Sequence, residues 1–330
     1  MNILARVAFF IAPVALVVSV GFSHAAEMLY VDHPLANRVW DMNNADFIEE
    51  SELMSGLNKR DVLLLGEVHD NLLHHELQRK FLKVRIDSGA QPALMMEQID
   101  AVNQIALDEA LSGNNREVKI EAVNKLISFN DWELYSPLLE VAIDNQLPVI
   151  ASNIPSRELR PVIWGGYDAY DADKLKYLAV EEVWNENRQA FLASNMGGAH
   201  CGQLRKELRV GLTRSQRLKD ALMVDSAISS IPRGIVAIVG SSHARRDIGL
   251  PLYFSAREPD ARIVSIGFVE VSPEKVNPYA YIDSATGEVP FDYVWFTPRM
   301  VRKNPCAEII KVAEEKSVEP VSSPSGEVEE

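Results

Sequence analysis

Acidic, amide and imidazole side chains stand at or shortly after the ends of four short apolar runs in this sequence. They are Glu67 and His69 at the end of DVLLLGE, Glu97 after PALMM, Asn153 at the end of LPVIASN, and His243 after GIVAIVG. Continuous apolar runs are typical of strands covered on both faces in a parallel sheet. Because the carboxyl ends of parallel strands lie at one edge, where ligands bind, we expect these five side chains to form one cluster.

Two of these strand ends share the pattern Gly-x-x-His, from Gly66 to His69 and from Gly240 to His243. A glycine lets the backbone turn tightly and lets a ligand approach closely. A histidine two residues after an acid can act as a base or bind a metal ion. Two histidines and a carboxylate are a common set of ligands for a divalent metal, so His69, His243 and Glu67 are the candidates for a metal site.

A structural interpretation of the same residues stays open. Arg157 or Arg245 could pair with the acids in a buried ionic network, and His69 could be a capping residue. One turn into the next helix, His74 shares a face with Gln78 and would point towards the site if that helix begins at the sheet edge. We expect His75 on the solvent-exposed face. The convergence of four strand ends favours a functional site.

The elements that must position these residues follow an α/β pattern. Strands are predicted at 61–67, 92–98, 147–153, 234–240 and 261–269, with an edge strand at 291–296. Helices are predicted at 71–88, 99–112, 116–128, 133–145, 173–193 and 203–230. This alternation predicts an α/β fold with a mostly parallel central sheet flanked by helices. The interval 155–232 lacks a strand-like run, and we expect it to be a helical insertion between the later strands.

Both ends of the chain are expected to lie outside the folded domain at 30–306. Residues 1–25 contain one charge, an apolar run and small residues before an expected cleavage site, as in a secretory signal peptide. The run is short for a membrane span, but an uncleaved anchor is the alternative. From this segment we expect an exported protein of the periplasm or cell envelope, and because no lipid-attachment cysteine follows the run we do not expect a lipoprotein. Residues 307–330 are predicted to be a disordered acidic tail.

Charge and cysteine content narrow the function further. The formal net charge is −14 and the pI is about 5.0, which argues against nucleic-acid binding because that requires a basic face. The two cysteines, Cys201 and Cys306, are expected to form a disulfide in an oxidising compartment. The alternative is that Cys201, next to His200, is a nucleophile or metal ligand.

Taken together, the motifs resemble the ChaN-like proteins, which are haem-binding uptake proteins of the Tiki/erythromycin-esterase-like superfamily. The resemblance covers about 40–306 and rests on LLGEVHDNLLHHELQ, MMEQ, ASNIPSR, the pair His200-Cys201, SQRLKDALM, GSSH with Gly249 and Pro251, and DYVWFTP…NPC. The residues that carry over are Gly66, Glu67, His69, Glu97, Asn153, His200, Gly240 and His243. The resemblance implies an α/β fold with an inserted helical part and a role in haem or iron acquisition.

The resemblance also implies a haem-binding homodimer with two haems stacked face to face and a tyrosine as iron ligand. It does not place that tyrosine. Tyr167 and Tyr170 in the insertion are the candidates, because a phenolate can bind ferric iron, although each could be an ordinary surface tyrosine. The insertion also offers arginines for the haem propionates, although such charges are usually solvated: Arg188, Arg205, Arg209, Arg214 and Arg217.

Haem binding for envelope iron uptake is therefore the preferred function, with an outer-membrane haem receptor as an expected partner. The alternative is a metal-dependent hydrolase, in which Glu67 or His69 activates water and His243 binds metal or stabilises charge. A third interpretation is a partner-binding scaffold whose polar cluster only stabilises the fold. Under the first two interpretations the supporting residues are Gly66, His74, Arg157, His200 and Gly240.

Overall fold

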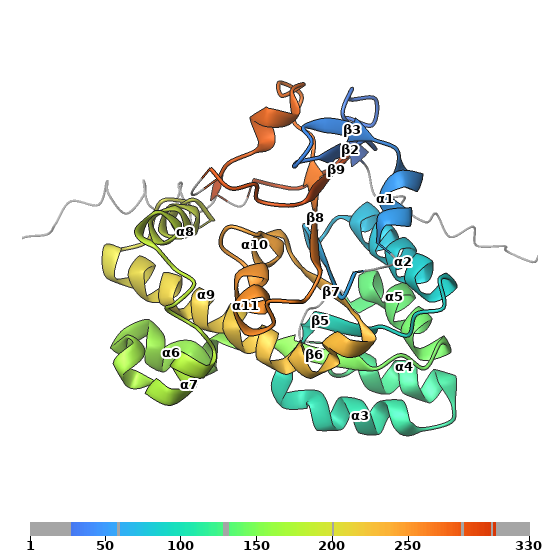
Figure 1. Cartoon of the computed structure of the whole chain (residues 1–330), viewed down its shortest axis with the longest axis horizontal. Helices are drawn as coiled ribbons and strands as arrows, with labels where there is room; N and C mark the ends of the chain where they lie inside the picture. The colour runs from blue at the N-terminus through green and yellow to red at the C-terminus, as the bar shows by residue number, and fades with distance from the viewer. Residues whose placement is uncertain are drawn as a thin grey trace, which may run out of the picture.

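The computed structural model describes residues 28–57, 60–127, 132–199, 201–284, 287–304 and 306–307. The predicted signal peptide, nearly all of the predicted acidic tail and His200 lie outside these residues. The described chain forms an α/β fold in which helices cover both faces of one eight-stranded sheet (Figure 1). The strand order is β3-β2-β9-β8-β4-β7-β5-β6.

Five parallel strands form the centre of the sheet and one end of it, as the apolar runs predict. They are β4 (Val62–Glu67), β5 (Ala93–Asp100), β6 (Val149–Asn153), β7 (Ile235–Gly240) and β8 (Ile263–Glu270). All six residues of β4 and all six of β7 are buried. Their apolar runs are continuous because helices cover both faces. The prediction of a mostly parallel sheet is confirmed.

The predicted edge strand is not at an edge. β9 (Tyr293–Thr297) pairs with β8 in parallel on one side and with β2 (Val39–Asp41) in antiparallel on the other. A short hairpin of β2 and β3 (Asp46–Ile48) therefore covers β9 and makes the sheet mixed. The edge prediction was wrong because three-residue strands leave almost no periodic signal. β1 (Met28–Leu29) pairs with β10 (Arg299–Met300) in a separate small sheet.

One face of the sheet is covered by the helices that follow β3, β4 and β5. They are α1 (Glu50–Gly56), α2 (Leu72–Asp87), α3 (Gln104–Ser112), α4 (Arg116–Asn124) and α5 (Trp132–Asp144), with a short 3₁₀ helix η1 (Ala101–Asn103). Phe81 of α2 and Tyr135 of α5 pack with Leu63 and Leu65 of β4 in one hydrophobic cluster. Since α5 packs on α2, the latter helix is buried on more than one side.

The other face is covered by the helical insertion and by α11 (Leu250–Arg257), on the left of the sheet in Figure 1. The insertion contains α6 (Ser156–Gly165), α7 (Ala172–Tyr177), α8 (Glu186–Ala199) and α9 (Lys206–Ala227), with the 3₁₀ helices η2 (Tyr167–Ala169) and η3 (Ile228–Arg233). The described residues of 155–232 contain no strand, as expected. The helix predicted at 173–193 is two helices, because the chain turns after α7 with Ala179 at a φ of 55°.

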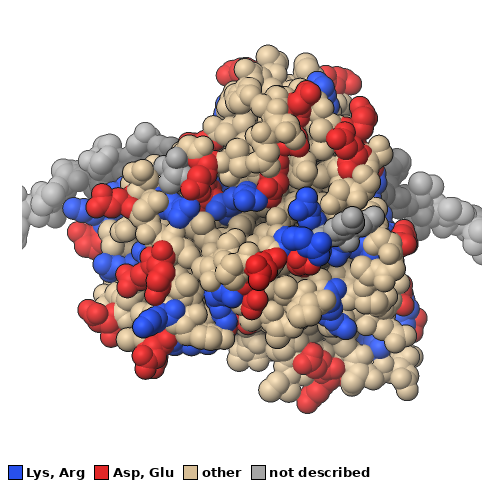
Figure 2. Space-filling model, viewed as in Figure 1, with Lys and Arg blue, Asp and Glu red and all other residues tan. Residues whose placement is uncertain are grey.

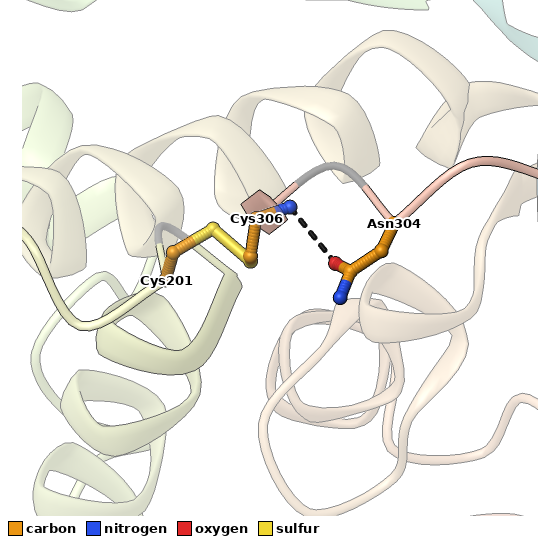
Figure 3. The surroundings of a disulfide bond; sticks show 3 residues. All are labelled: Cys201, Asn304 and Cys306. Carbon is orange, nitrogen blue, oxygen red and sulfur yellow. Dashed lines mark hydrogen bonds between the residues drawn. A yellow bond between two sulfur atoms is a disulfide. The ribbon is translucent and has the colours of Figure 1, made fainter. Parts of the chain in front are cut away.

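A disulfide joins the insertion to the end of the described chain. Cys201 lies just after α8 and is bonded to Cys306, which confirms the predicted pairing (Figure 3). On the way to Cys306, Arg302 forms ion pairs with Asp70 and Glu270. The segment after β10 is thus attached both to the loop after β4 and to the insertion. Among the described residues, no helix is long and apolar enough to cross a membrane.

Candidate functional site

The ends of three adjacent strands bring four of the five predicted cluster residues together. Glu67 ends β4, Glu97 lies in β5, and His243 lies in the single-turn helix α10 (Ser241–Ala244) directly after β7. His69 follows β4 by two residues. Because β7 lies between β4 and β5 in the sheet, these side chains come from neighbouring positions at one edge.

Glu67 is buried and is the centre of the first half of this cluster. Its Oε1 accepts hydrogen bonds from the Tyr135 hydroxyl at 2.6 Å and from Gln98 Nε2 at 3.1 Å, and lies 2.8 Å from His69 Nδ1. Its Oε2 accepts a hydrogen bond from Gln78 Nε2 at 2.6 Å. Every neighbour thus offers a donor to one carboxylate, which holds that group in place in a buried environment.

Glu97 is the centre of the second half and is also buried. Its Oε1 lies 2.9 Å from Lys219 Nζ and 3.1 Å from His243 Nε2, while Oε2 accepts the Gly240 backbone N–H at 2.8 Å. His243 uses its other ring nitrogen, Nδ1, to bind the buried carboxylate of Asp220 in a short hydrogen bond. Lys219 and Asp220 both come from α9, so the insertion completes the cluster that the strands begin.

His69 lies where the two halves meet. A β-carbon placed on Gly240 would lie 3.1 Å from His69 Nε2 and 3.6 Å from Glu97 Oε2. At Gly66 a β-carbon would lie 2.7 Å from the β-carbon of Ala244 in α10. The two motif glycines therefore provide space for close packing. Gly240 has an ordinary φ of −58°, so the tight turn expected there is absent.

The paired charges shift the pKa values of the second half. Burial alone would lower the pKa of His243, but the Glu97 and Asp220 carboxylates outweigh it and raise the pKa to about 9. Burial would raise the pKa of Glu97, but His243 and Lys219 hold it well below its usual value. Burial raises the pKa of Asp220. At neutral pH His243 is a cation with both N–H groups donated to acids, so it is not a general base in this state.

His69 is the cluster histidine that reaches solvent, with a side chain 42% exposed. Burial of the remainder would lower its pKa, but the hydrogen bond and charge of Glu67 raise it. Glu67 fixes the orientation of the ring through Nδ1 and directs Nε2 towards Gly240 and Glu97. This arrangement suits the transfer of a proton at Nε2.

Two predicted residues lie away from the cluster. Asn153 donates a hydrogen bond to Asp100 at 2.6 Å instead of reaching the acids. The Arg157 side chain is 68% exposed and lies 3.8 Å from Glu158. Arg245, the other proposed partner of the acids, binds Asp247. The buried network therefore uses Lys219 and histidines in place of arginines.

The assignments of the two neighbouring histidines of α2 were reversed. His74 is buried between the Val68 backbone N–H and the Thr297 hydroxyl, and burial lowers its pKa to about 3. It is a neutral structural residue. His75, expected in solvent, is buried, and its Nδ1 lies 3.3 Å from Glu67 Oε2. Its ring packs edge-on against Tyr135 of α5, so the covering of α2 by α5 brings this face into the site.

The described residues contain no group of three or more His, Cys, Asp or Glu side chains arranged to hold a metal ion. Both nitrogens of His243 bind acids, and Glu67 is surrounded by donors. A metal at Glu67, His69 and His243 would require these bonds to rearrange, so that assignment stays a prediction.

The residues that sequence reasoning missed are Tyr135, Gln98, Lys219 and Asp220. Lys219 and Asp220 lie within the run SQRLKDALM, and nothing in this run indicated that Lys219 would bind Glu97 while Asp220 binds His243. A buried tyrosine in an amphipathic helix is ordinarily read as core. Only the packing of α5 and α9 on opposite faces of the sheet brings these residues to the same edge.

Comparison with known proteins gives one family. The sequence model described as haem-binding uptake, Tiki superfamily, ChaN matches residues 53–254. A structure of cofacial heme binding to ChaN of Campylobacter jejuni has a TM-score of 0.62 at 19% identity and covers 78% of this chain and 95% of that chain, which shows a shared fold. An erythromycin esterase covers 78% of this chain and 95% of its own at 12% identity, with a TM-score of only 0.41. No curated protein sequence matches significantly.

Proposed function

Because the chain belongs to the ChaN family of haem-binding uptake proteins in the Tiki superfamily, we propose that it binds haem at the bacterial cell envelope and serves haem or iron uptake. The observation that carries this proposal is the family match over 53–254, which includes the sheet-edge cluster and the helical insertion. The fold shared with ChaN of Campylobacter jejuni supports it.

Export and assembly are parts of the same proposal. The N-terminal segment directs the chain to the periplasm or envelope, where it is cleaved or stays as an anchor. The Cys201–Cys306 disulfide supports this location, because disulfides persist in oxidising compartments. Two copies form a homodimer when they bind haem, and an outer-membrane haem receptor is the partner that supplies it.

The two candidate tyrosines differ in their fitness as iron ligands. They line a cavity of about 460 Å³ together with Asp168, Glu181 and Glu182. The Tyr167 hydroxyl donates to the Arg214 carbonyl at 3.2 Å, and burial raises its pKa to about 12. The Tyr170 hydroxyl makes no hydrogen bond within the described part of the chain, and its side chain is half-buried.

Tyr170 is therefore the better candidate. Burial raises its pKa, so it is a neutral phenol in the unliganded protein and must release its proton to bind ferric iron. Three acids and one lysine, Lys176, line the cavity, and this net negative charge does not suit the propionates of haem, so we expect those groups to bind elsewhere.

Hemin titration of the exported protein tests the proposal. A saturable shift of the Soret band at about one hemin per chain is expected, with an increase in sedimentation coefficient if the dimer forms. Tyr170→Phe is expected to weaken binding at least about tenfold. The control is Tyr177→Phe, because the Tyr177 hydroxyl is bound to Arg257 and its side chain is exposed. A flat titration of the wild-type protein contradicts the proposal.

A second function is favoured by one observation, the clustering of buried acids and histidines around the half-exposed His69. In this alternative the protein is a hydrolase, with His69 moving a proton at Nε2 while Glu67 orients the ring. A divalent metal, if one binds, would supply the activated water at Glu67, His69 and His243.

The two functions are separated by Glu67→Gln and His243→Ala. Hemin titration, hydrolysis of a panel of ester and amide substrates, and metal analysis are carried out on the same samples. Loss of hydrolysis with unchanged hemin binding supports the hydrolase. Unchanged values of both, with lower thermal stability, make the cluster structural.

A further inference from the structure

A groove lies between α8, α11 and the loop before β9, outside the cluster of acids and histidines. Its volume is about 570 Å³, within the usual range for small-molecule sites. It is lined by Val183, Arg188, Arg246, Pro251, Leu252, Ser255, Ala256, Glu288 and Val289. Most of these residues are apolar or small, and the charged ones are two arginines and one glutamate. Figure 2 shows basic side chains beside acidic ones on the side of this face that carries α8.

Arg188 is held rigidly at this groove. Its side chain is only 17% exposed, and Nη1 donates to the Val183 carbonyl at 2.7 Å. Its Nε is buried and has no hydrogen-bond partner among the described residues. A buried guanidinium with an unused N–H group is unusual, since buried polar groups are normally paired. Arg188 is therefore not an ordinary solvated charge, which was the alternative to its role as a propionate ligand.

A carboxylate of the protein itself already binds there. Nη2 of Arg188 donates to both oxygens of Glu288 at 3.0 Å, and Glu288 lies on a loop with its side chain 51% exposed. Arg246, whose side chain is 41% exposed, adds a second guanidinium, which binds Asp292 through Nη1. The groove thus offers guanidinium groups to a carboxylate beside an apolar wall. An incoming ligand would displace the exposed side chain of Glu288.

We propose that this groove binds a carboxylate of an amphipathic ligand, and that in the haem-binding function proposed above it is the subsite for a porphyrin propionate. Arg188 and Arg246 bind the carboxylate and replace the contact with Glu288. Pro251, Leu252 and Val289 contact the apolar edge of the ligand. This inference rests on the proposed function for the identity of the ligand and on the groove for the residues.

The position of the groove agrees with the tyrosine assignment. Glu181 and Glu182 line the cavity that contains Tyr170, and Val183 lines the arginine groove. The linings of the two cavities therefore include consecutive residues of one short segment, Glu181 to Val183. The tyrosine cavity, with three acids and one lysine, disfavours propionates, and the arginine groove attracts them, so the two sites have complementary chemistry for a ligand with an electrophilic centre and anionic side chains.

The test uses three porphyrins and four variants of the full exported chain. Hemin, metal-free protoporphyrin IX and its dimethyl ester are titrated by absorbance and by quenching of tryptophan fluorescence. Arg188→Gln and Arg246→Gln are each expected to raise the Kd for protoporphyrin IX at least about tenfold, because a charge-assisted hydrogen bond is lost. Glu288→Gln is expected to lower the Kd, because it removes the internal competitor.

Arg233→Gln is the matched control, since this arginine is exposed at the opposite end of β7 and forms no ion pair among the described residues. The dimethyl ester is expected to bind wild-type protein at least about tenfold more weakly than the diacid. Thermal unfolding of each variant shows whether it folds. Should Arg188→Gln not fold, the opposite effect of Glu288→Gln remains a test.

Each outcome is decisive. Unchanged Kd values in folded Arg188→Gln and Arg246→Gln overturn the groove assignment, and if wild-type protein still binds hemin the proposed function stands. An ester that binds as tightly as the diacid also overturns it. Failure of wild-type protein to bind either hemin or protoporphyrin IX overturns both the groove assignment and the haem-binding proposal.

Discussion

At the scale of single residues, two buried histidines of this protein, His243 and His74, hold different charge states because their partners differ. His243 faces two acids and is a cation, whereas His74 faces a backbone N–H group and a hydroxyl and is neutral. A neutral imidazole can accept the Val68 N–H through Nδ1 and donate to Thr297 through Nε2. A proton added to Nδ1 would break the first of these bonds.

His74 is therefore expected to make the protein sensitive to acid. Its pKa of about 3 in the fold lies below the ordinary value of about 6.5, so the unfolded chain binds a proton that the folded chain does not. The protein keeps its full stability above a pH of about 6.5 and loses stability as the pH falls towards 3, by on the order of 5 kcal/mol in total. Urea unfolding at several pH values measures it. A His74→Gln variant with the same acid sensitivity as wild type would contradict the assignment.

Glu97 provides a second test at this scale. Glu97→Gln leaves Lys219 and His243 buried without their common acid, so a loss of about 3–5 kcal/mol in the free energy of unfolding is expected. NMR titration of the His243 ring should show a lower pKa at the same time. The matched control is Glu121→Gln, which removes an exposed, solvent-screened pair with Lys125 and should leave the free energy of unfolding almost unchanged. An equal decrease in the free energy of unfolding of the two variants would show that the buried pairing does not stabilise the fold.

At the scale of elements, the crossing of α6 and α9 positions Lys219 and Asp220. The two helices approach so closely at Gly211 that a β-carbon there would lie 2.1 Å from the Ile163 carbonyl oxygen. The backbone of α6 cannot move away without shifting its packing on α9. The second half of the cluster therefore depends on a glycine more than two turns away from it.

Gly211→Ala is accordingly expected to destabilise the protein by about 1–3 kcal/mol and to weaken the Lys219–Glu97 pair. Its matched control is Gly198→Ala in α8, where no atom lies within 4 Å of an added β-carbon. That change should leave stability the same or raise it by up to about 1 kcal/mol, because alanine favours helix. Thermal unfolding compares the two variants, and similar melting temperatures would argue against close packing of α6 on α9 at Gly211.

At the scale of the whole molecule, the disulfide connects parts that are 105 residues apart in sequence. It ties the segment after β10, which is also held by Arg302, to the end of α8 over the insertion. Closing so long a loop restricts the unfolded chain strongly.

Cys201→Ser with Cys306→Ser, or treatment with a dithiol reductant, is therefore expected to lower the free energy of unfolding by about 2–5 kcal/mol. The measurement is chemical unfolding with and without reductant, with thiol titration of the denatured protein as a control for the bond. The double variant should be insensitive to reductant. Two reactive thiols in the unreduced, denatured protein would contradict the presence of the bond in solution.

The local sequence pattern was enough to predict the central strands and the candidate functional residues at their ends. β4, β5 and β7 each contain a continuous apolar run because both their faces are buried, so Glu67, Glu97 and the Gly240 motif at the ends of these runs stood out. Parallel strands direct their ends to one edge, and from this rule the meeting of Glu67, His69, Glu97 and His243 could be foreseen. The pairing of the two cysteines was predicted from their number together with the expected export to an oxidising compartment.

Packing between elements that are distant in sequence decided the features that the sequence pattern did not predict. Whether His74 or His75 faces the acids depends on α5 lying over α2, and whether β9 is an edge depends on a hairpin of two three-residue strands. Lys219, Asp220 and Tyr135 join the cluster because helices on opposite faces of the sheet reach the same edge. Periodicity in a sequence reports that a face is buried, but it contains no information about which element buries it.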